Sequence, residues 1–152
     1  MLKRILAPMA IVAIAIAALV IVWNSEIWLF LDMYAFILVP GLGTAFALGI
    51  SGLKEGLKAF VAPLDPSADE RELRTASSFF EALGMSYACF ATLGATISII
   101  DMLKNLADKS QVGPRMAVAL ISIEYAAILI AFIVLPYRFA LKRKIAALGE
   151  RP

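Results

Sequence analysis

The sequence contains no histidine and only one cysteine, Cys89, in 152 residues. Without histidine the chain lacks the commonest side-chain ligand for transition metals and the usual general base of enzymes. A single cysteine excludes a disulfide within the chain and gives no information on the redox compartment. We therefore expect a protein that is not an enzyme and that binds neither a metal nor a cofactor.

Charged residues are scarce as well. They make up 17% of the chain, while 62% of it is hydrophobic, whereas a soluble domain is about a quarter charged and about half apolar. The net charge of +2 is too small to indicate binding to nucleic acid. The composition therefore predicts one integral membrane domain covering residues 1–152, with no nucleic-acid partner.

Four apolar segments are long enough to cross a bilayer as helices, which takes about 20 residues. The predicted spans are residues 5–23, 28–50, 85–103 and 115–137. The first follows Lys3 and Arg4, but its apolar core exceeds the ~7–15 residues of a signal peptide and another apolar segment follows at once. We therefore expect a membrane anchor rather than a cleaved leader, and an all-α membrane protein with four transmembrane helices.

The segments between the spans predict how the helices pair. Residues 24–27 and 104–114 are short polar turns, so the spans form two hairpins. Residues 51–84 form a longer amphipathic insert, in which Ser67–Glu70 fit a capping box that starts a helix running on into the third span. The tail, residues 138–152, is predicted to be a basic helix that leaves the membrane.

Lysine and arginine positions predict the orientation. Of the 14 basic residues, only Lys104, Lys109 and Arg115 lie near the two short turns. The others lie in the N-terminus, the 51–84 insert and the tail. Because cytoplasmic loops carry the excess of lysine and arginine, both termini and the insert are expected in the cytoplasm.

The third and fourth spans each carry a line of small residues at helical spacing. They are Ala88, Ala91, Ala95 and Ser98 in the third span, and Ala119, Ser122 and Ala126 in the fourth. Small residues let membrane helices approach closely, so tight packing is one interpretation, favoured by about two to one on spacing alone. The other is a narrow, weakly polar passage or a socket for another helix.

One carboxylate, Glu124, lies in the middle of the fourth span. It follows Arg115 by roughly 13 Å of helix, where a charge costs on the order of 3 kcal/mol to insert. It lies about 200° around the helix from the small-residue line, so we expect it to face the other hairpin or another subunit. It is either a protonated group that fixes helix register, with Tyr34, Thr44 or Thr96 as donor, or a proton-exchanging site.

Three further features of the spans carry weaker predictions. Asp32 lies near the outer surface, where an anion would concentrate incoming cations, although an ordinary boundary charge fits equally. Pro40, Gly41 and Gly43 bend the second span or permit a close crossing. The basic residues 142–144 fit the anionic inner leaflet or fix orientation.

Several of these segments resemble the MotA/TolQ/ExbB proton channel family. Residues 102–144 are similar to the family stretch that contains "IGP-MAVAL-TTLYG" and a later "P-A-KLK", and residues 113–120, "GPRMAVAL", are the most specific part. Residues 30–60 resemble the second span of the MotA type, with its early aspartate and glycine pair, and 93–106 resemble "IGTVIGLI-ML-NM". The chain looks like a MotA- or PomA-type A subunit with a shortened insert.

The resemblance implies a ring of five chains in the bacterial inner membrane around two single-span B-type subunits related to MotB or ExbD. Ion flow past a B-subunit aspartate would turn the ring or exert force on envelope components. The pore-lining residues that the resemblance implies are Ala88, Ala91, Ala95, Ser98, Ala119, Ser122, Ile123 and Ala126. Glu124 and Asp32 are the candidate ion-exchanging carboxylates, and Gly94 and Pro136 have structural or gating roles.

The chain departs from the family pattern at several pore positions. Ala95 replaces a threonine, Ser122 and Ile123 replace a threonine pair, Glu124 stands where the pattern is apolar, and Ala88 replaces a proline. Fewer hydroxyls would coordinate sodium poorly, which favours protons. The insert is too short for the module that meets the flagellar switch, so we expect another task. A non-conducting scaffold ring that anchors or clusters an envelope or filament structure is the alternative, and a small carrier is a weaker one.

Overall fold

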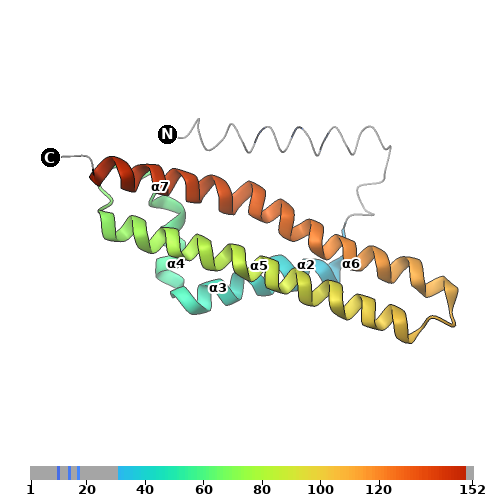
Figure 1. Ribbon diagram of the computed structural model, residues 1–152. Coiled ribbons are helices and arrows are strands. Elements are labelled where there is room, and N and C mark those ends of the chain that lie inside the picture. Colours follow the sequence, from blue (N-terminus) through green and yellow to red (C-terminus); the bar gives the residue numbers. More distant parts are fainter. Residues whose placement is uncertain (1–9, 11–13, 15–16, 18–30, 150–152) are drawn as a thin grey trace.

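A computed structural model describes residues 10, 14, 17 and 31–149 of the chain. The first predicted span, residues 5–23, and the 24–27 turn therefore lie almost wholly outside the described residues. Within the described part every regular element is a helix, and three segments are long and apolar enough to cross a membrane. The helices lie alongside one another in an elongated bundle (Figure 1).

The first of these three segments covers Met33–Ser51. It consists of α2 (Met33–Phe36), the π-helical segment η2 (Ile37–Leu42) and α3 (Gly43–Ser51). The π-helical turns contain Pro40, whose ring nitrogen cannot donate a backbone hydrogen bond and so disturbs the regular α-helical pattern. Asp32 caps the start by accepting a hydrogen bond from the Ala35 backbone N at 2.7 Å, so the helix begins inside the predicted 28–50 span.

A sharp turn then leads into the short helix α4 (Leu53–Val61). Gly52 has a φ of +88°, in the left-handed region that side chains other than glycine rarely adopt. The turn ends α3 and redirects the chain, so that α4 runs across the bundle instead of continuing along it (Figure 1).

The second long segment is α5 (Glu70–Lys104), a single helix of 35 residues. The prediction that one helix runs through Gly84 into the third span is confirmed. The predicted capping box at Ser67–Glu70 is wrong by two residues, because the N-cap is Asp69. Its carboxylate accepts from the Glu72 backbone N at 2.7 Å, and the Glu72 side chain accepts from the Asp69 backbone N at 3.4 Å.

The third long segment joins the predicted fourth span to the basic tail. It contains α6 (Lys109–Leu129), the π-helical segment η3 (Ile130–Val134) and α7 (Leu135–Gly149). The π-helical turns come directly before Pro136, which removes a backbone donor at that point. Figure 1 shows α5 and the α6–α7 helix running side by side in opposite directions, joined by the turn after Lys104.

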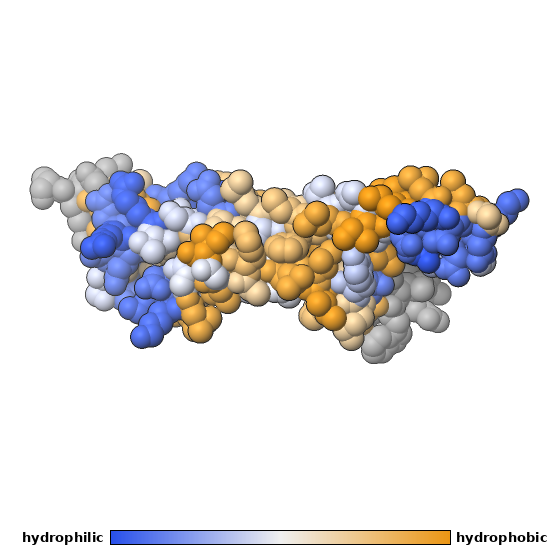
Figure 2. Space-filling view, turned by 90° about the horizontal axis from the view of Figure 1, so that it is seen from below, coloured by the Kyte–Doolittle hydropathy of each residue, from blue (hydrophilic) through white to orange (hydrophobic). Residues whose placement is uncertain are grey.

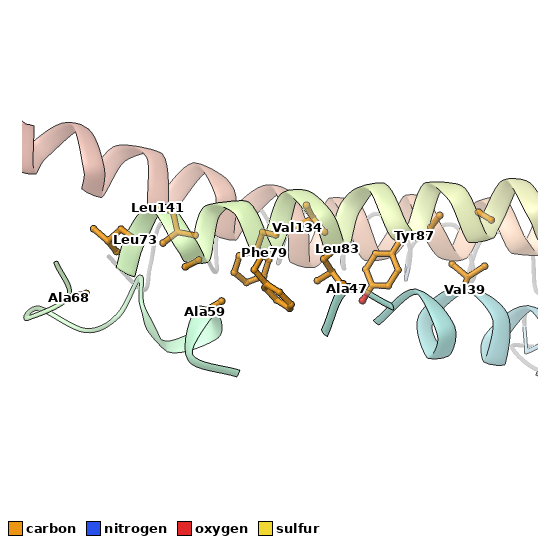
Figure 3. Close-up of a cluster of buried hydrophobic side chains, with 14 residues drawn as sticks. Val39, Ala47, Ala59, Ala68, Leu73, Phe79, Leu83, Tyr87, Val134 and Leu141 are labelled. Carbon is orange, nitrogen blue, oxygen red and sulfur yellow. The ribbon is translucent and has the colours of Figure 1, made fainter. Parts of the chain in front are cut away.

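Aromatic rings join α4, α5 and α7 at one end of the bundle. Phe80 stacks on Tyr137 with ring centroids 4.8 Å apart, and Phe60 meets Phe79 and Phe80 edge-on at 5.9 and 5.1 Å. Phe79 is 1% exposed and Phe80 is fully buried. Figure 3 shows the buried cluster extending along α5, between this helix and its neighbours.

The loop between α4 and α5 is held by Lys144 of α7. Its Nζ donates to the backbone carbonyl oxygens of Ala62, at 3.1 Å, and Asp65. The Asp65 carboxylate accepts from the Oγ and the backbone N of Ser67 at 2.6 and 2.9 Å. These hydrogen bonds from Ser67, with a smaller contribution from the charge of Lys144, hold the pKa of Asp65 below its ordinary value of 3.8.

Replacing Ser67 by alanine is expected to lower the free energy of unfolding at neutral pH and to have little effect in acid. Because the pKa of Asp65 is lower in the folded chain than in the unfolded chain, the stabilisation is present above the unfolded value. It is lost as the pH falls through the folded value. Thermal unfolding of wild type and Ser67→Ala in detergent, from neutral pH to below 3.8, measures this difference.

The control is Ser78→Ala, which removes an exposed hydroxyl that bonds only within α5. A deficit of Ser67→Ala that stayed constant into acid would show that the Asp65 carboxylate is not its cause.

Candidate functional site

Two ion pairs lie near the opposite ends of the apolar part of the α5–α6 hairpin. Asp101 pairs with Arg115 near the turn, and Glu81 pairs with Arg138 toward the other end at 3.4 Å. From Glu81 to Asp101 helix α5 rises about 30 Å, which is about the thickness of the hydrocarbon core of a bilayer. Figure 2 shows hydrophilic residues gathered at both ends and hydrophobic residues across the middle. The pairs mark the two expected membrane boundaries.

Most of the small residues in the predicted lines are buried inside a single chain. The buried members are Ala91, Ala95 and Ser98 of α5, and Ala119, Ser122 and Ala126 of α6. They lie where α5 and α6 pack together, and the hydroxyl of Ser122 donates to the carbonyl oxygen of Val118 at 2.9 Å. This burial favours the packing interpretation of the small-residue lines, while a pore-lining role for these residues stays a prediction.

Gly94 is a point of close approach between the two helices. A Cβ at this position would lie 2.9 Å from the Oγ of Ser122 and 2.7 Å from the Cδ2 of Leu38. The absence of a side chain therefore lets α5 approach α6 and the second span at the same level. The structural or gating role that the family resemblance implied for Gly94 stays a prediction.

Replacing Gly94 by alanine is expected to lower the free energy of unfolding by about 1–3 kcal/mol, because the added methyl group overpacks the contact. Gly113→Ala is the matched control, since a Cβ there has no neighbouring atom within 4 Å, and alanine favours a helix by about 0.5–1 kcal/mol. Thermal unfolding in detergent compares the two. Equal effects at the two glycines would contradict the assigned contact.

Glu124 lies on the outward face of α6. It is exposed on the chain, beside Leu120 and Ile123, which are 59% and 52% exposed. It lies roughly 13 Å along the helix from Arg115 and about 21 Å from Arg138, well inside the expected hydrocarbon region. Within the described residues no hydrogen bond or ion pair to Glu124 is present.

The donors suggested for Glu124 make other contacts. The hydroxyl of Thr44 hydrogen-bonds that of Tyr87 at 3.0 Å, and Thr96 donates to the carbonyl oxygen of Thr92 at 2.7 Å. Tyr34 is 44% exposed. The interpretation in which Glu124 is satisfied by donors of the same chain therefore has no support among the described contacts.

Asp32 acts as a helix cap. Its carboxylate accepts from the Ala35 backbone N, and its own backbone N donates to the hydroxyl of Tyr125 at 3.3 Å. The ring of Tyr125 also meets Phe36 edge-on, with centroids 6.3 Å apart. These contacts attach the start of the second span to α6, which gives Asp32 a structural role whether or not it also attracts ions.

The remaining predicted residues divide between the surface and the interior. Ala88 and Ile123 are exposed, so they lie on outward faces of α5 and α6, and Pro136 is buried at the start of α7. Among the described residues, no three His, Cys, Asp or Glu side chains lie together as metal ligands would.

The sequence reasoning did not name the hydroxyl of Thr92, and it named Thr96 only as a possible donor to Glu124. Thr92 and Thr96 are exposed, on the face opposite Gly94, and Thr92 donates to the carbonyl oxygen of Ala88 at 2.8 Å. They are spaced by one helical turn, as the small residues are, and this shared spacing is the signal that would have identified them. They add polar atoms to the outward surface of the third span.

The chain is similar in sequence to a known protein family and to proteins of two bacteria. Residues 58–151 match the model of the MotA/TolQ/ExbB proton channel family. Motility protein A of Aquifex aeolicus (strain VF5) is 34% identical over 105 residues, which are 68% of this chain and 41% of the relative. Uncharacterized protein YtxD of Bacillus subtilis (strain 168) is 30% identical over 105 residues, which are 69% of this chain and 39% of the relative.

The chain thus spans about two fifths of the length of these curated relatives. The family match contains the whole of α5, the α6–α7 helix, Glu124 and both boundary ion pairs. It covers more than half of the chain, and the all-helical architecture with its apolar spans agrees with a membrane-embedded family. The chain belongs to the MotA/TolQ/ExbB proton channel family.

Proposed function

We propose that the chain is the A-type subunit of a proton-driven motor or channel complex in a bacterial inner membrane. Five copies would form a ring around two single-span B-type subunits related to MotB or ExbD, with both termini of each copy in the cytoplasm. Proton flow would turn the ring or exert force on envelope components. Support comes from the family match over α5 to α7 and from the relative named Motility protein A.

The observation that carries the proposal is the exposed carboxylate of Glu124 in the apolar part of α6. Lipid does not solvate a carboxylate at this depth, so a water-filled passage or a polar group outside the described residues, from this chain or another, has to cover it. A glutamate that exchanges a proton with such a neighbour can pass protons between the two faces of the membrane. Its apolar neighbours Leu120 and Ile123 would complete the contact with a partner helix.

The surrounding hydroxyls favour protons over sodium as the transported ion. Selecting a metal cation requires several oxygen atoms that replace its hydration shell. Ser98 and Ser122 are buried between the helices, and the exposed hydroxyls of Thr92 and Thr96 donate to backbone carbonyls of α5. A proton needs only one titrating carboxylate, which Glu124 supplies.

The short insert suggests a task other than flagellar rotation. In the structure the 51–84 segment contains α4, the following loop and the first turns of α5. Helix α4 is nine residues long and packs against α7 and the N-terminal part of α5. We propose that output passes through the B-type partner on the opposite side of the membrane.

A non-conducting scaffold ring is a second candidate function. It is favoured by the burial of the small residues in the α5–α6 contact, because these residues are then occupied in holding one chain together. Such a ring would anchor or cluster envelope structures, and its Glu124 would be a fixed, protonated hydrogen-bonding group between copies.

Reconstitution distinguishes the two functions. The chain is co-expressed with a candidate B-type subunit, purified as a complex and placed in vesicles with an internal pH dye, and a potassium diffusion potential is applied. The proposal predicts acidification that requires both subunits and the potential. A complex that forms without detectable flux supports the scaffold, and failure to bind the B-type subunit contradicts the motor or channel function.

A further inference from the structure

The short helix α4 lies at one expected membrane boundary. Gly56 of α4 packs against Leu48 at the end of the second span and against Phe79 of α5. Phe79 is only about 3 Å along α5 from Glu81, whose ion pair with Arg138 marks that boundary. Because α4 also runs across the bundle (Figure 1), its axis lies close to the expected plane of the membrane surface.

The residues of α4 form three faces. One face is buried against the bundle and contains Gly56 and Ala59. The second is apolar and exposed: Leu53, Leu57 and Val61 are 62%, 60% and 60% exposed. The third is charged and exposed, and it consists of Lys54, Glu55 and Lys58. With about 100° between successive residues, the apolar face lies between the buried face and the two lysines.

The contacts of the buried face show which way the apolar face is turned. Phe60 lies beside Leu53 and Leu57 on the helix and meets Phe80 and Tyr137, at the level of the boundary ion pair. Glu55, Lys58 and Ala59 lie farther around the helix and line a groove with the first turns of α5. Leu57 and Val61 border the same groove. The start of α5 is farther from the membrane, so the flank with Leu53 and Phe60, which does not line the groove, is the one nearer to it.

The two lysines complete the pattern of an interfacial helix. Lys54 and Lys58 are exposed, one turn apart, beside the apolar face, and neither forms an ion pair within the described residues. The distribution of basic residues assigns this end of the bundle to the cytoplasmic side, where the leaflet is anionic. A helix with such faces lies in the headgroup region, with apolar side chains at the edge of the acyl chains and lysines near the phosphates.

We propose that α4 binds the surface of the inner leaflet, with Leu53, Leu57 and Val61 in the boundary of the acyl chains and Lys54 and Lys58 on the phosphates of anionic lipids. Lys144 holds the helix in this position by binding the carbonyl oxygens of Ala62 and Asp65 just after it ends. The exposed apolar face continues from that of the second span, where Phe46 and Ile50 are 54% and 64% exposed. This continuity and the lysines favour lipid over a second copy of the chain. The proposal requires that the bundle spans the membrane with both termini in the cytoplasm, and it does not depend on proton conduction.

Spin labels on α4 test the position of its faces. Cys89 is replaced by alanine, and L57C and E55C are each introduced into the full chain in vesicles of phosphatidylcholine and phosphatidylglycerol. Collision rates with oxygen, which is enriched in lipid, and with an aqueous nickel chelate are then measured. The ratio of oxygen to nickel accessibility is expected to be at least about threefold higher at position 57 than at position 55.

Two outcomes would overturn the proposal. Equal ratios at the two positions would show that α4 lies in water. A label at position 57 that is shielded from both reagents would show that protein, such as a second copy, covers the apolar face.

The lysines are tested by lipid preference. Spin-labelled phosphatidylglycerol is expected to lose its preference over spin-labelled phosphatidylcholine for the protein surface in Lys54→Gln/Lys58→Gln, by up to about fivefold per lysine. The control is Lys104→Gln/Lys109→Gln, at the other end of the bundle, which is expected to change the inner-leaflet preference little when the label is confined to that leaflet. A preference that is unchanged in the α4 variant would contradict the assignment of these lysines to lipid phosphates.

Discussion

Replacing Glu124 by glutamine is expected to reduce proton flux through the reconstituted complex by at least about 100-fold. Glutamine keeps the size and the hydrogen-bonding capacity of the side chain but cannot release a proton. The structure places Glu124 exposed on the outward face of α6, without a partner among the described residues, so the change should leave the fold of the single chain intact. The initial rate of dye-reported acidification in vesicles containing the complex with its B-type subunit measures the effect.

Glu124→Asp and Glu81→Gln are the controls for this result. Aspartate keeps a titrating carboxyl group at the same depth, so part of the flux should survive. Glu81 is a carboxylate of the boundary ion pair, with its side chain 58% exposed, and its loss should affect flux little. If Glu124→Gln conducted like wild type, the glutamate would be a structural hydrogen-bonding group and protons would take another path.

Replacing Phe80 by alanine is expected to lower the free energy of unfolding by about 3–5 kcal/mol. The side chain is fully buried, stacks on Tyr137 of α7 at 4.8 Å and meets Phe60 of α4 at 5.1 Å. Its removal leaves a cavity where three helices meet, and the surrounding aromatic rings can fill such a cavity only in part. Thermal unfolding of the detergent-solubilised chain, followed by circular dichroism, measures the loss.

Phe139→Ala is the matched control because Phe139 is on the same helix as Tyr137 but is 60% exposed. Its effect should be within a few tenths of a kcal/mol in detergent. A similar loss for the two phenylalanines would mean that the aromatic cluster does not hold α4, α5 and α7 together.

The sequence predicted the helical architecture well because apolar length and turn residues are local signals. The continuous helix through Gly84 was visible in the sequence. The polar turn predicted at 104–114 is present but shorter, because α6 already begins at Lys109. The exact cap was missed since Ser67 and Asp69 are both good N-cap residues. In the structure the hydroxyl of Ser67 donates a hydrogen bond to the carboxylate of Asp65 in the preceding loop, so it does not cap the helix.

The candidate site was less accessible to sequence reasoning because spacing defines a helix face but does not identify what covers it. Spacing alone favoured packing over a passage by only about two to one. The contact of Gly94, beside the α5 line, with Ser122 of the α6 line brings the two lines together within one chain. The contacts of Asp32 with Tyr125 and of Thr44 with Tyr87 connect residues 93 and 43 positions apart. No local pattern reveals such pairs.

The most direct test of the proposed function is a cryo-electron microscopy image of the chain purified with its B-type partner. The proposal predicts five copies around two partner helices, with the outward face of α6 that carries Glu124 turned toward those helices. A chain that stays monomeric, or a ring in which α5 and α6 contact lipid and no partner helix occupies the centre, would contradict it.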